Sequence, residues 1–536
     1  MDGLIGFLLI SFPIALAFVM LAFLRRQAHT TGVVVWLLTV VIAVFAFQTD
    51  PAIAATASAA GIVNSFPISL MVATSILMMT YMQESGALQR LIVFFKTLGG
   101  GSRPMQIMLI SLGLGLFLVG IGATPVSMLP PVMLALGFSP LVAVALPAIG
   151  YDPLTTFALL GVPAVVFWTE YNGLHEPDVT LAEAGSVFAW YMPIVTTGIA
   201  IAMLWIGGGR RLVRDREGIL LAIICGLTAG TTAIVMNSPL VNQTTLTNVA
   251  AGIAVMTVLM IYTRLRHRSL VDRSTLTEDD LRTERGMSLV RASSPWVILV
   301  ALCLLTNLIP EIKYLLFNVL TFPVKVGDYP TPGGAGIPTR FLWQAYTLML
   351  IATVLSMPFL RHDRATLRNT MIKTLHRAPR PVLASAIFFS MAEVMNFSGY
   401  SVGTGGWTFP TDPSNNMIFL LATLTSSSLG PLYPMTAAFL GLLAGFISGS
   451  EASAIKMFTR YHYETSNLIG ANAIVVAASN GIGGGLASVL SPAKIQNAAA
   501  VIDRIGIEGE VIRYGLVVAI LMTLVTALVT MWFAFL

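Results

Sequence analysis

The sequence predicts an all-α polytopic membrane protein with about 12 transmembrane helices and two re-entrant hairpins, arranged as inverted repeats with discontinuous helices. Of its 536 residues, 56% are hydrophobic and only 10% are charged, which is not the composition of a soluble domain. Apolar runs such as Gly515–Leu536 reach the ~20 residues that cross a bilayer. Small residues interrupt two such stretches, at Gly120–Pro125 and Ser448–Ser453. Each interruption is followed by a second one, at Gly150–Pro153 and at Asn480–Gly484.

These paired interruptions indicate where a solute binds. Backbone that leaves helical geometry inside a bilayer has unsatisfied N–H and C=O groups, unless protein or a hydrated cavity receives them. Interruptions at matching places in two halves are typical of a transporter's central site. We therefore expect hairpins over 105–138 and 433–466, and broken helices over 141–168 and 471–491. The two hairpin tips should meet halfway through the membrane and enclose the solute.

The net charge of +5 follows the membrane topology and does not require nucleic acid as a partner. Basic residues cluster in loops between apolar spans, at 210–216, 264–291 and 361–380. This is the positive-inside pattern, which places those loops in the cytoplasm and the acidic loop 170–183 outside. The mixed-charge run 278–285 is predicted to be a solvated helix face.

The second half of the chain repeats the first in layout. Pro67 and Pro381 begin similar spans, but the charge rule gives these spans opposite orientations. This indicates inverted topology. The alternative is that the two halves have similarly placed Pro and Gly residues only by chance. The expected domains are N-terminal scaffold helices (1–65), a first inverted repeat (66–207), central scaffold helices with cytoplasmic loop 264–294 (208–379), and a second inverted repeat (380–536).

The interrupted segments resemble those of the L-lactate permease family, the lactate and glycolate permeases of bacteria. The resembling residues are Asn396–Gly399, Phe446–Ser453, Ala478–Asn480 and Leu490–Pro492, with a matching layout over Met105–Gly161. The resemblance implies a scaffold domain and a mobile transport domain with two hairpins. It also implies an elevator-like motion and a homodimer, neither of which the residues themselves indicate.

Two departures from the family pattern bear on the substrate. The first tip has Val119 where the family usually has Glu, and its loop is shorter. The acidic residue of the second tip is kept as Glu451, and Glu393 replaces an apolar residue of the family.

An anion in a low-dielectric cavity needs hydrogen-bond donors, which the N-termini of half-helices and nearby side chains supply. The alternatives are helix breaking and capping for the polar tip residues, and snorkelling to the surface for Lys494. The predicted substrate-binding residues are Gly120, Gly122, Ala123, Thr124, Pro125, Tyr151, Asn396, Gly449, Ser450, Ser453, Asn480, Gly481, Ser491 and Lys494.

Ionisable residues within spans are candidates for coupling transport to a proton or cation. We assign this role to Glu451, Glu393 and Asp152. The alternatives are a helix N-cap for Glu451, a buried pair with a Lys or Arg for Glu393, and a cap or cation ligand for Asp152. The six histidines are assigned to loops or their edges.

These features predict a secondary active transporter of a small monocarboxylate such as L-lactate or glycolate. It would work by proton symport with alternating access, in the cytoplasmic (inner) membrane of a prokaryote. The alternative is Na⁺-coupled or exchange transport of another organic or inorganic anion; an ion channel or a membrane-embedded enzyme is more remote. No cofactor or metal site is expected, because no HExxH, Ser-His-Asp or Cys/His motif appears, and Gly481–Gly485 lacks the Lys-Ser/Thr of a phosphate loop.

Overall fold

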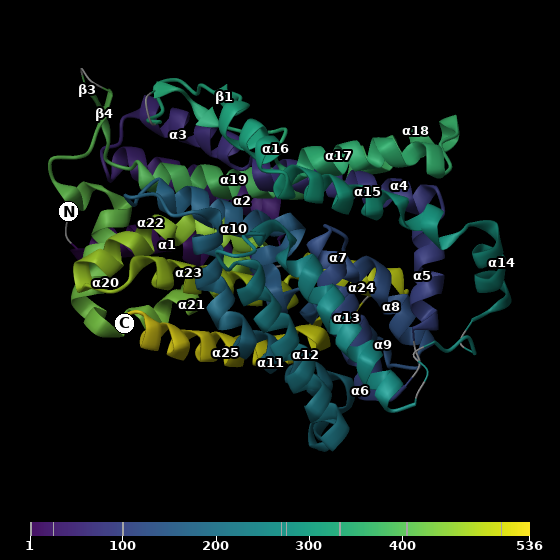
Figure 1. Cartoon of the computed structure of the whole chain (residues 1–536). Helices are drawn as coiled ribbons and strands as arrows, with labels where there is room; N and C mark the ends of the chain where they lie inside the picture. The colour runs from purple at the N-terminus through teal and green to yellow at the C-terminus, as the bar shows by residue number, and fades with distance from the viewer. Residues whose placement is uncertain are drawn as a thin grey trace.

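The computed structural model describes residues 3–24, 26–98, 101–267, 269, 271–274, 276–331, 334–403, 406–504 and 506–536. Within these ranges, 11 helices are long and apolar enough to cross a membrane. The strands form two short antiparallel pairs, β1 with β2 and β3 with β4. The predicted all-α polytopic architecture is therefore confirmed (Figure 1).

Long helices alternate with short helical segments along the whole chain. The first half contains α1 (Gly3–Ala22), α2 (Ala28–Phe45), α3 (Pro51–Asn64), α4 (Phe66–Glu84), α5 (Ala87–Thr97), α6 (Arg103–Gln106), the π-helix η1 (Ile107–Leu114), α7 (Gly115–Gly120), α8 (Pro125–Ala135), α9 (Pro140–Ile149), the 3₁₀ segment η2 (Asp152–Phe157), α10 (Ala158–Asn172) and α11 (Leu181–Arg214). The middle contains α12 (Arg216–Met236), η3 (Thr244–Leu246), α13 (Thr247–Leu265) and α14 (Glu278–Gly286).

The second half contains α15 (Leu289–Leu308), α16 (Pro310–Tyr314), η4 (Leu315–Val319), β1 (Pro323–Val324), β2 (Ile337–Pro338), α17 (Ala345–Ser356), η6 (Met357–Phe359), α18 (Arg364–Arg377), α19 (Pro379–Asn396), β3 (Ser401–Gly403), β4 (Gly406–Thr408), η7 (Pro413–Asn415), α20 (Met417–Leu429), η8 (Gly430–Leu432), α21 (Pro434–Ser448), α22 (Glu451–Ile469), α23 (Ala473–Leu486), η9 (Ser488–Leu490), α24 (Pro492–Val501) and α25 (Glu508–Phe533).

Both predicted hairpin tips are breaks between helices. The first tip separates α7 from α8 and contains Gly122 at φ +80°; the second separates α21 from α22 and contains Gly449 at φ +71°. Glycine populates this left-handed region readily because it has no Cβ. The first broken helix is also found as predicted, with η2 between α9 and α10.

The second broken helix is interrupted later than the sequence predicted. Helix α23 runs unbroken through Asn480–Gly484, and the interruption falls at η9. The glycines serve close packing instead: a Cβ at Gly483 would lie 1.9 Å from the carbonyl oxygen of Ala438, and one at Gly445 would lie 2.3 Å from that of Gly484. Small residues let the backbones of α21 and α23 approach each other.

The sequence placed His462 wrongly. It is not in a loop but lies fully buried in α22, where its Nδ1 is 2.6 Å from the Tyr433 hydroxyl. The run 278–285 forms a helix with an exposed charged face, as predicted, but Asp280 on its other face is buried and pairs with Lys96 of α5 at 2.8 Å. Both contacts join residues far apart in the sequence, so local patterns do not reveal them.

The helices pack in reciprocal pairs between the two halves. Helices α2 and α3 pack on α19, and α17 and α18 pack on α4; likewise α1 contacts α20, and α15 contacts α5. Each second hairpin arm instead packs within its own half, α8 on α5 and α22 on α20. The pairs between the halves include α1–α3 and α15–α18, which the sequence assigned to scaffold outside the repeats. Contacts made by one half thus recur with the roles of the halves exchanged.

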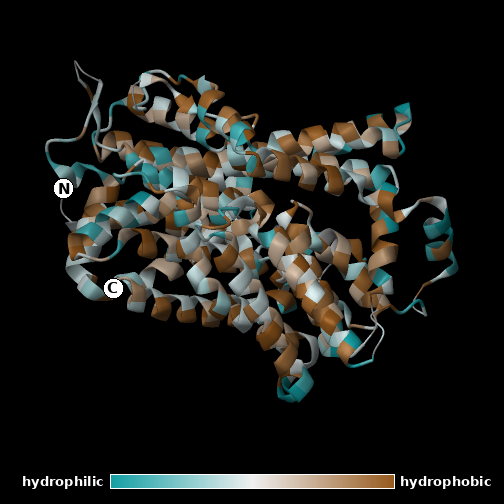
Figure 2. Cartoon of the chain, in the orientation of Figure 1, coloured by the Kyte–Doolittle hydropathy of each residue, from teal (hydrophilic) through white to brown (hydrophobic). Residues whose placement is uncertain are grey.

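The surface of the bundle is apolar, and the charged residues gather at its ends. Large hydrophobic side chains are exposed on α2, α11 and α25, among them Leu37, Trp190 and Leu521. Figure 2 shows hydrophobic residues on helices throughout the bundle. It also shows a hydrophilic end where α11 joins α12, the segment that contains Arg210–Arg216. Contact with lipid favours such a surface, because the hydrocarbon tails offer no hydrogen bonds to polar groups.

Candidate functional site

The centre of the molecule is the place where the second hairpin tip meets the unwound segment η2. Glu451 is the first residue of α22 and is 3% exposed. The Thr156 hydroxyl donates a hydrogen bond to its Oε1 at 2.6 Å, while its Oε2 has no hydrogen-bond partner among the residues that the structure describes. A Cβ at Gly485 would lie 2.6 Å from that free oxygen, so only glycine leaves room for this carboxylate.

Lys494 lies on α24, beside the interruption of the second broken helix. Its Nζ donates to the Ser488 hydroxyl at 3.0 Å and sits 4.3 Å from the centroid of the Tyr151 ring, in a cation–π contact. Asp152 follows Tyr151 in η2 and is 4% exposed. Lys494 interacts electrostatically with both Asp152 and Glu451. The two broken helices therefore cross around one ammonium and two carboxylates.

The local sequence explains why η2 is unwound. Pro153 has no N–H to donate to a helix, and it directly follows Asp152. Leu159, Leu160 and Gly161 then adopt left-handed φ angles of +53°, +58° and +75°. The unwound segment carries Tyr151, Asp152 and Thr156 to the centre, where they contact Lys494 and Glu451.

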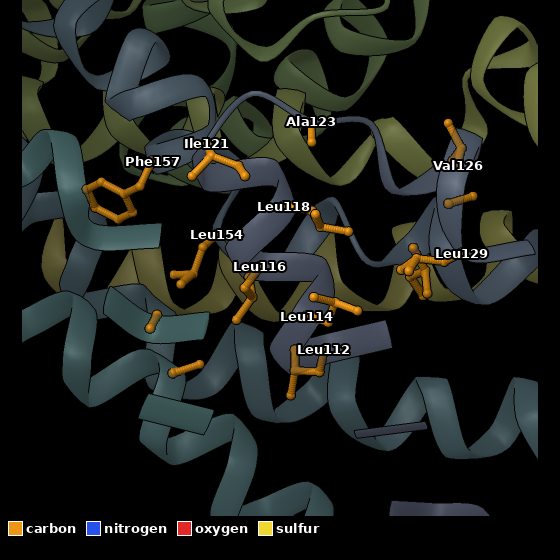
Figure 3. Packing of buried hydrophobic residues seen from close by; sticks show 14 of the residues in the cluster. Leu112, Leu114, Leu116, Leu118, Ile121, Ala123, Val126, Leu129, Leu154 and Phe157 are labelled. Carbon is orange, nitrogen blue, oxygen red and sulfur yellow. The ribbon is translucent and has the colours of Figure 1, made fainter. Parts of the chain in front are cut away.

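The first hairpin tip approaches the same segment from another direction. The Ser75 hydroxyl of α4 donates to the carbonyl oxygen of Gly122 at 2.6 Å, and a Cβ at Gly122 would lie 2.5 Å from Met349 of α17. A Cβ at Gly120 would lie 2.8 Å from the backbone nitrogen of Val249 in α13. Helix α7 contacts η2, and Figure 3 shows Leu154 and Phe157 of η2 beside the apolar side chains of α7.

The predicted site residues therefore divide into groups. Asn480 donates to the Ala454 carbonyl at 3.1 Å and Gly481 lies against Phe188, so both lie at contacts between helices. The hydroxyl of Ser453 is buried and has no hydrogen-bond partner among the described residues. Gly120, Gly122, Ala123, Thr124 and Pro125 form the first tip. The residues gathered around the second tip and the crossing are Tyr151, Asp152, Gly449, Ser450, Glu451, Ser491 and Lys494.

Glu393 and Asn396 lie elsewhere, on a cavity of about 440 Å³ between α3, α10, α19, α22 and the loop before α17. The Nζ of Lys456 is 2.6 Å from Glu393 Oε1 and 2.7 Å from both carboxylate oxygens of Glu170. Glu393 thus makes the buried pair with a lysine that was its structural alternative. Lys456 and Glu170 were missed from the sequence, although a lysine within a predicted membrane hairpin is the signal that could have identified them.

No metal or cofactor site is found in the part of the chain that the structure describes. No three His, Cys, Asp or Glu side chains of the described residues could jointly hold a metal ion. Cys225 and Cys303 are free and buried. The charged side chains gathered at the centre are Asp152, Glu451 and Lys494.

Buried charged groups at the crossing of two broken helices, within a polytopic bundle, define the class of membrane transport proteins. The chain belongs to the L-lactate permease family, which it matches over residues 6–536. It is 23% identical to glycolate permease GlcA of Escherichia coli (strain K12), over 97% of this chain and 94% of that protein. It is likewise 23% identical to the L-lactate permease of Bacillus subtilis (strain 168), with the same coverage.

Among solved structures, the chain is similar to the YdaH transporter of Alcanivorax borkumensis, with 14% sequence identity and a TM-score of 0.43. The match covers 88% of this chain and 86% of the YdaH chain. The family membership makes the protein a multi-pass membrane permease and not an enzyme.

Proposed function

We propose that the protein is a secondary active transporter that carries a small monocarboxylate, such as L-lactate or glycolate, together with a proton across the cytoplasmic membrane of a prokaryote. The relatives named as lactate and glycolate permeases support the substrate class. The observation that carries the proposal is Lys494, a half-buried lysine whose ammonium contacts Ser488 and Tyr151 where the two broken helices cross.

A carboxylate substrate fits the charge of this site. Ammonium groups donate charge-assisted hydrogen bonds to carboxylates, and these bonds are stronger in a low-dielectric site than in water. Helices α22 and α24 begin beside the crossing, so their N-terminal ends contribute further positive potential. A small hydroxy acid would place its carboxylate at Lys494 and its hydroxyl among Ser488, Ser491 and the tip backbone.

The two acidic residues explain why a proton would travel with the anion. With Glu451 and Asp152 both ionised, they and Lys494 carry one net negative charge, which repels a carboxylate. One proton makes the group neutral, and it thereby strengthens the binding of the anion. By linkage, the anion strengthens the binding of the proton by the same factor. Glu451 Oε2 and both carboxylate oxygens of Asp152 have no hydrogen-bond partner among the described residues, so either acid has an oxygen free to accept it.

Alternating access would arise from movement of the hairpins and broken helices against the remaining helices. Glu451 and Thr156 join the second hairpin to the first broken helix, so these elements would move as one body. The interlocked pairs of α1–α4 with α15–α20 would form the frame.

Uptake into proteoliposomes tests this function. Purified protein is reconstituted, a pH or Na⁺ gradient is imposed, and labelled lactate, glycolate, pyruvate and a dicarboxylate are offered in turn. We expect monocarboxylate uptake driven by the pH gradient. Uptake that responds only to the Na⁺ gradient would show that Na⁺, and not a proton, is the coupling ion. If no monocarboxylate were taken up, the proposal would be overturned.

The variant Glu451→Gln tests whether Glu451 binds the proton that is transported with the anion. We expect it to lose uptake driven by the pH gradient, because an amide cannot exchange a proton at this position. Glu510→Gln is the matched control, since Glu510 is an exposed carboxylate at the start of α25. Proton-driven uptake that survived Glu451→Gln would remove this residue from the coupling mechanism.

A further inference from the structure

The cavity of about 440 Å³ beside Asn396 lies at the end of α10 that the positive-inside rule assigns to the outer side of the membrane. Among the described residues, three cationic and two anionic side chains line it: Arg340, Lys456, Arg460, Glu170 and Glu393. The described lining therefore carries one net positive charge. A single negative charge inside the cavity would balance it.

Lys456 and the two acids form a closed group within this lining. The Lys456 Nζ donates to both oxygens of Glu170 at 2.7 Å and lies 2.6 Å from Glu393 Oε1. The Asn64 amide donates to the same oxygen of Glu393 at 2.6 Å. Donors of this kind favour the ionised form of a carboxylate. An ammonium has three donors and these contacts use all of them, so Lys456 keeps none for a ligand.

The two arginines of the cavity have neutral hydrogen-bond partners instead. The terminal nitrogens of Arg460 donate to the Asn396 carbonyl at 3.0 Å and to the Tyr400 hydroxyl at 3.3 Å. Glu464 lies 3.9 Å from the Nε of Arg460, but its side chain is 30% exposed and is not part of the cavity wall. Water screens an ion pair of this kind, so Arg460 contributes positive potential to the cavity.

Arg340 holds the donors that remain free. Its Nε donates to the Phe317 carbonyl at 3.1 Å, and its guanidinium carbon lies 4.5 Å from the centre of the Phe317 ring and 5.7 Å from that of the Trp168 ring. Within the described part of the chain, its two terminal nitrogens have no hydrogen-bond acceptor and no carboxylate partner. The two cation–π contacts help to hold the guanidinium in place. A fork of N–H donors therefore remains available on the cavity wall.

We propose that this cavity is a second, outer binding site for the small monocarboxylate, and that Arg340 holds the carboxylate through its two terminal nitrogens. The planar fork of a guanidinium matches a carboxylate in two parallel hydrogen bonds. Val165, Trp343 and Phe389 add apolar surface on the same wall for the rest of a small acid. The cavity volume falls within the roughly 300–1,000 Å³ of small-molecule pockets. The identity of the anion rests on the proposed function.

The outer site is distinct from the crossing of the broken helices. Arg460 and Glu451 are nine residues apart on α22, or roughly 13.5 Å along the helix axis. One anion can therefore occupy the cavity whether or not the crossing is filled. A positively charged site in this position concentrates the substrate on the outer side of the second hairpin.

Intrinsic fluorescence of the purified full-length protein tests the outer site without relying on transport. Trp168 lies beside Arg340, so a carboxylate bound there changes the surroundings of this indole. We expect lactate to give a saturable change in emission, which Trp168→Phe reduces. In Arg340→Gln, the lactate concentration at half-saturation should rise about tenfold or more, because charged hydrogen bonds are lost. Lys494→Met, which lacks the ammonium of the crossing, should keep the change.

Lys325→Gln is the matched control, since Lys325 is an exposed cation in the same loop as Arg340. It should bind lactate as the wild type does. Should Arg340→Gln not fold, Arg340→Lys keeps the charge without the fork and should bind lactate about tenfold less tightly. A lactate response that survived both Arg340 substitutions, that Lys494→Met abolished, or that was absent from the wild type would overturn the outer site. An equal response to chloride would overturn its assignment to carboxylates.

Transport then shows whether the substrate uses this site on its way in. We expect Arg340→Gln to raise the external lactate concentration for half-maximal uptake by intact cells about tenfold, with a maximal rate within about threefold of the wild type. An unchanged half-maximal concentration would contradict an outer site on the path of the substrate. Failure of the wild type to carry any monocarboxylate would instead refute the proposed function and leave the fluorescence result standing.

Discussion

Lys494 and Glu451 are held at the centre of the bundle by few and specific partners. The ammonium contacts the Ser488 hydroxyl and the Tyr151 ring and interacts electrostatically with Asp152 and Glu451. Glu451 accepts from Thr156 and keeps one oxygen without a hydrogen-bond partner among the described residues. Ionisable groups inside a membrane bundle are candidates for a functional site by default. Gly485 supports this arrangement by leaving space beside Glu451.

Replacing Lys494 should abolish anion binding at the crossing while sparing the fold. We expect Lys494→Met to lower the affinity for lactate by about 2–5 kcal/mol, since a buried charged partner of the carboxylate is lost. Lys494→Arg should retain part of the affinity. Equilibrium exchange of labelled lactate measures this, with the exposed Lys325→Met as control. Normal exchange in Lys494→Met would place the substrate elsewhere.

Gly483 gives a prediction about stability. A Cβ at this position would overlap the Ala438 carbonyl, which is backbone and cannot rotate away. We expect Gly483→Ala to destabilise the protein by about 1–3 kcal/mol as α21 and α23 are forced apart. Gly509→Ala is the control, because nothing lies within 4 Å of its added Cβ. Thermal unfolding in detergent measures both, and equal midpoints would contradict this account of α21–α23 packing.

At the scale of elements, glycine and proline residues in the sequence predicted most of the helix breaks, but not all of them. Gly122, Gly449 and Pro153 interrupt a helix through their own backbone properties, without help from distant contacts. The sequence alone could therefore predict these interruptions. The glycines of α23 look the same in the sequence, yet they pack against α21 within a continuous helix. Which role a glycine takes depends on the neighbouring helix, and one sequence does not show that neighbour.

The docking of α14 on α5 has a defined dependence on pH. Burial acts to raise the pKa of Asp280, but hydrogen bonds from Lys96 and Thr277 outweigh it and lower this pKa below its ordinary value. The ionised form thus stabilises docking, fully above the ordinary pKa of about 4, and the effect is lost as the pH falls through the lowered value.

We expect Asp280→Asn to weaken the docking of α14 by about 1–3 kcal/mol at neutral pH, because Lys96 loses its charged acceptor. Hydrogen exchange of the α14 amides should accelerate in the variant, and Asp279→Asn, whose carboxylate is largely exposed, is the control. Identical exchange in wild type and Asp280→Asn at neutral pH would show that the Lys96 pair does not hold the helix.

For the whole molecule, the class and layout were predictable, whereas the cluster around Lys456 was not. Hydropathy and charge determine which segments enter lipid, and both are local properties. The pairing of Glu170, Glu393 and Lys456 joins three helices distant in sequence, so it appears only when the two halves interlock. The same interlocking brings Asp152 and Lys494 together.

The predicted orientation is testable with single cysteines, because native Cys225 and Cys303 are buried and should react little. In intact cells, we expect a membrane-impermeant maleimide to label Asp178→Cys, in the acidic loop before α11. Asp279→Cys on α14 should be labelled only after permeabilisation, as the positive-inside rule requires. The reverse pattern would invert the assigned topology.

The central claim is that the carboxylate binds where the two broken helices cross. An experimental structure of the protein with bound lactate tests it most directly. We predict density for the carboxylate within hydrogen-bonding distance of Lys494 Nζ, between Tyr151 and the second hairpin tip. Lactate bound only in the cavity lined by Glu393 and Arg460, with the crossing unoccupied, would contradict the account.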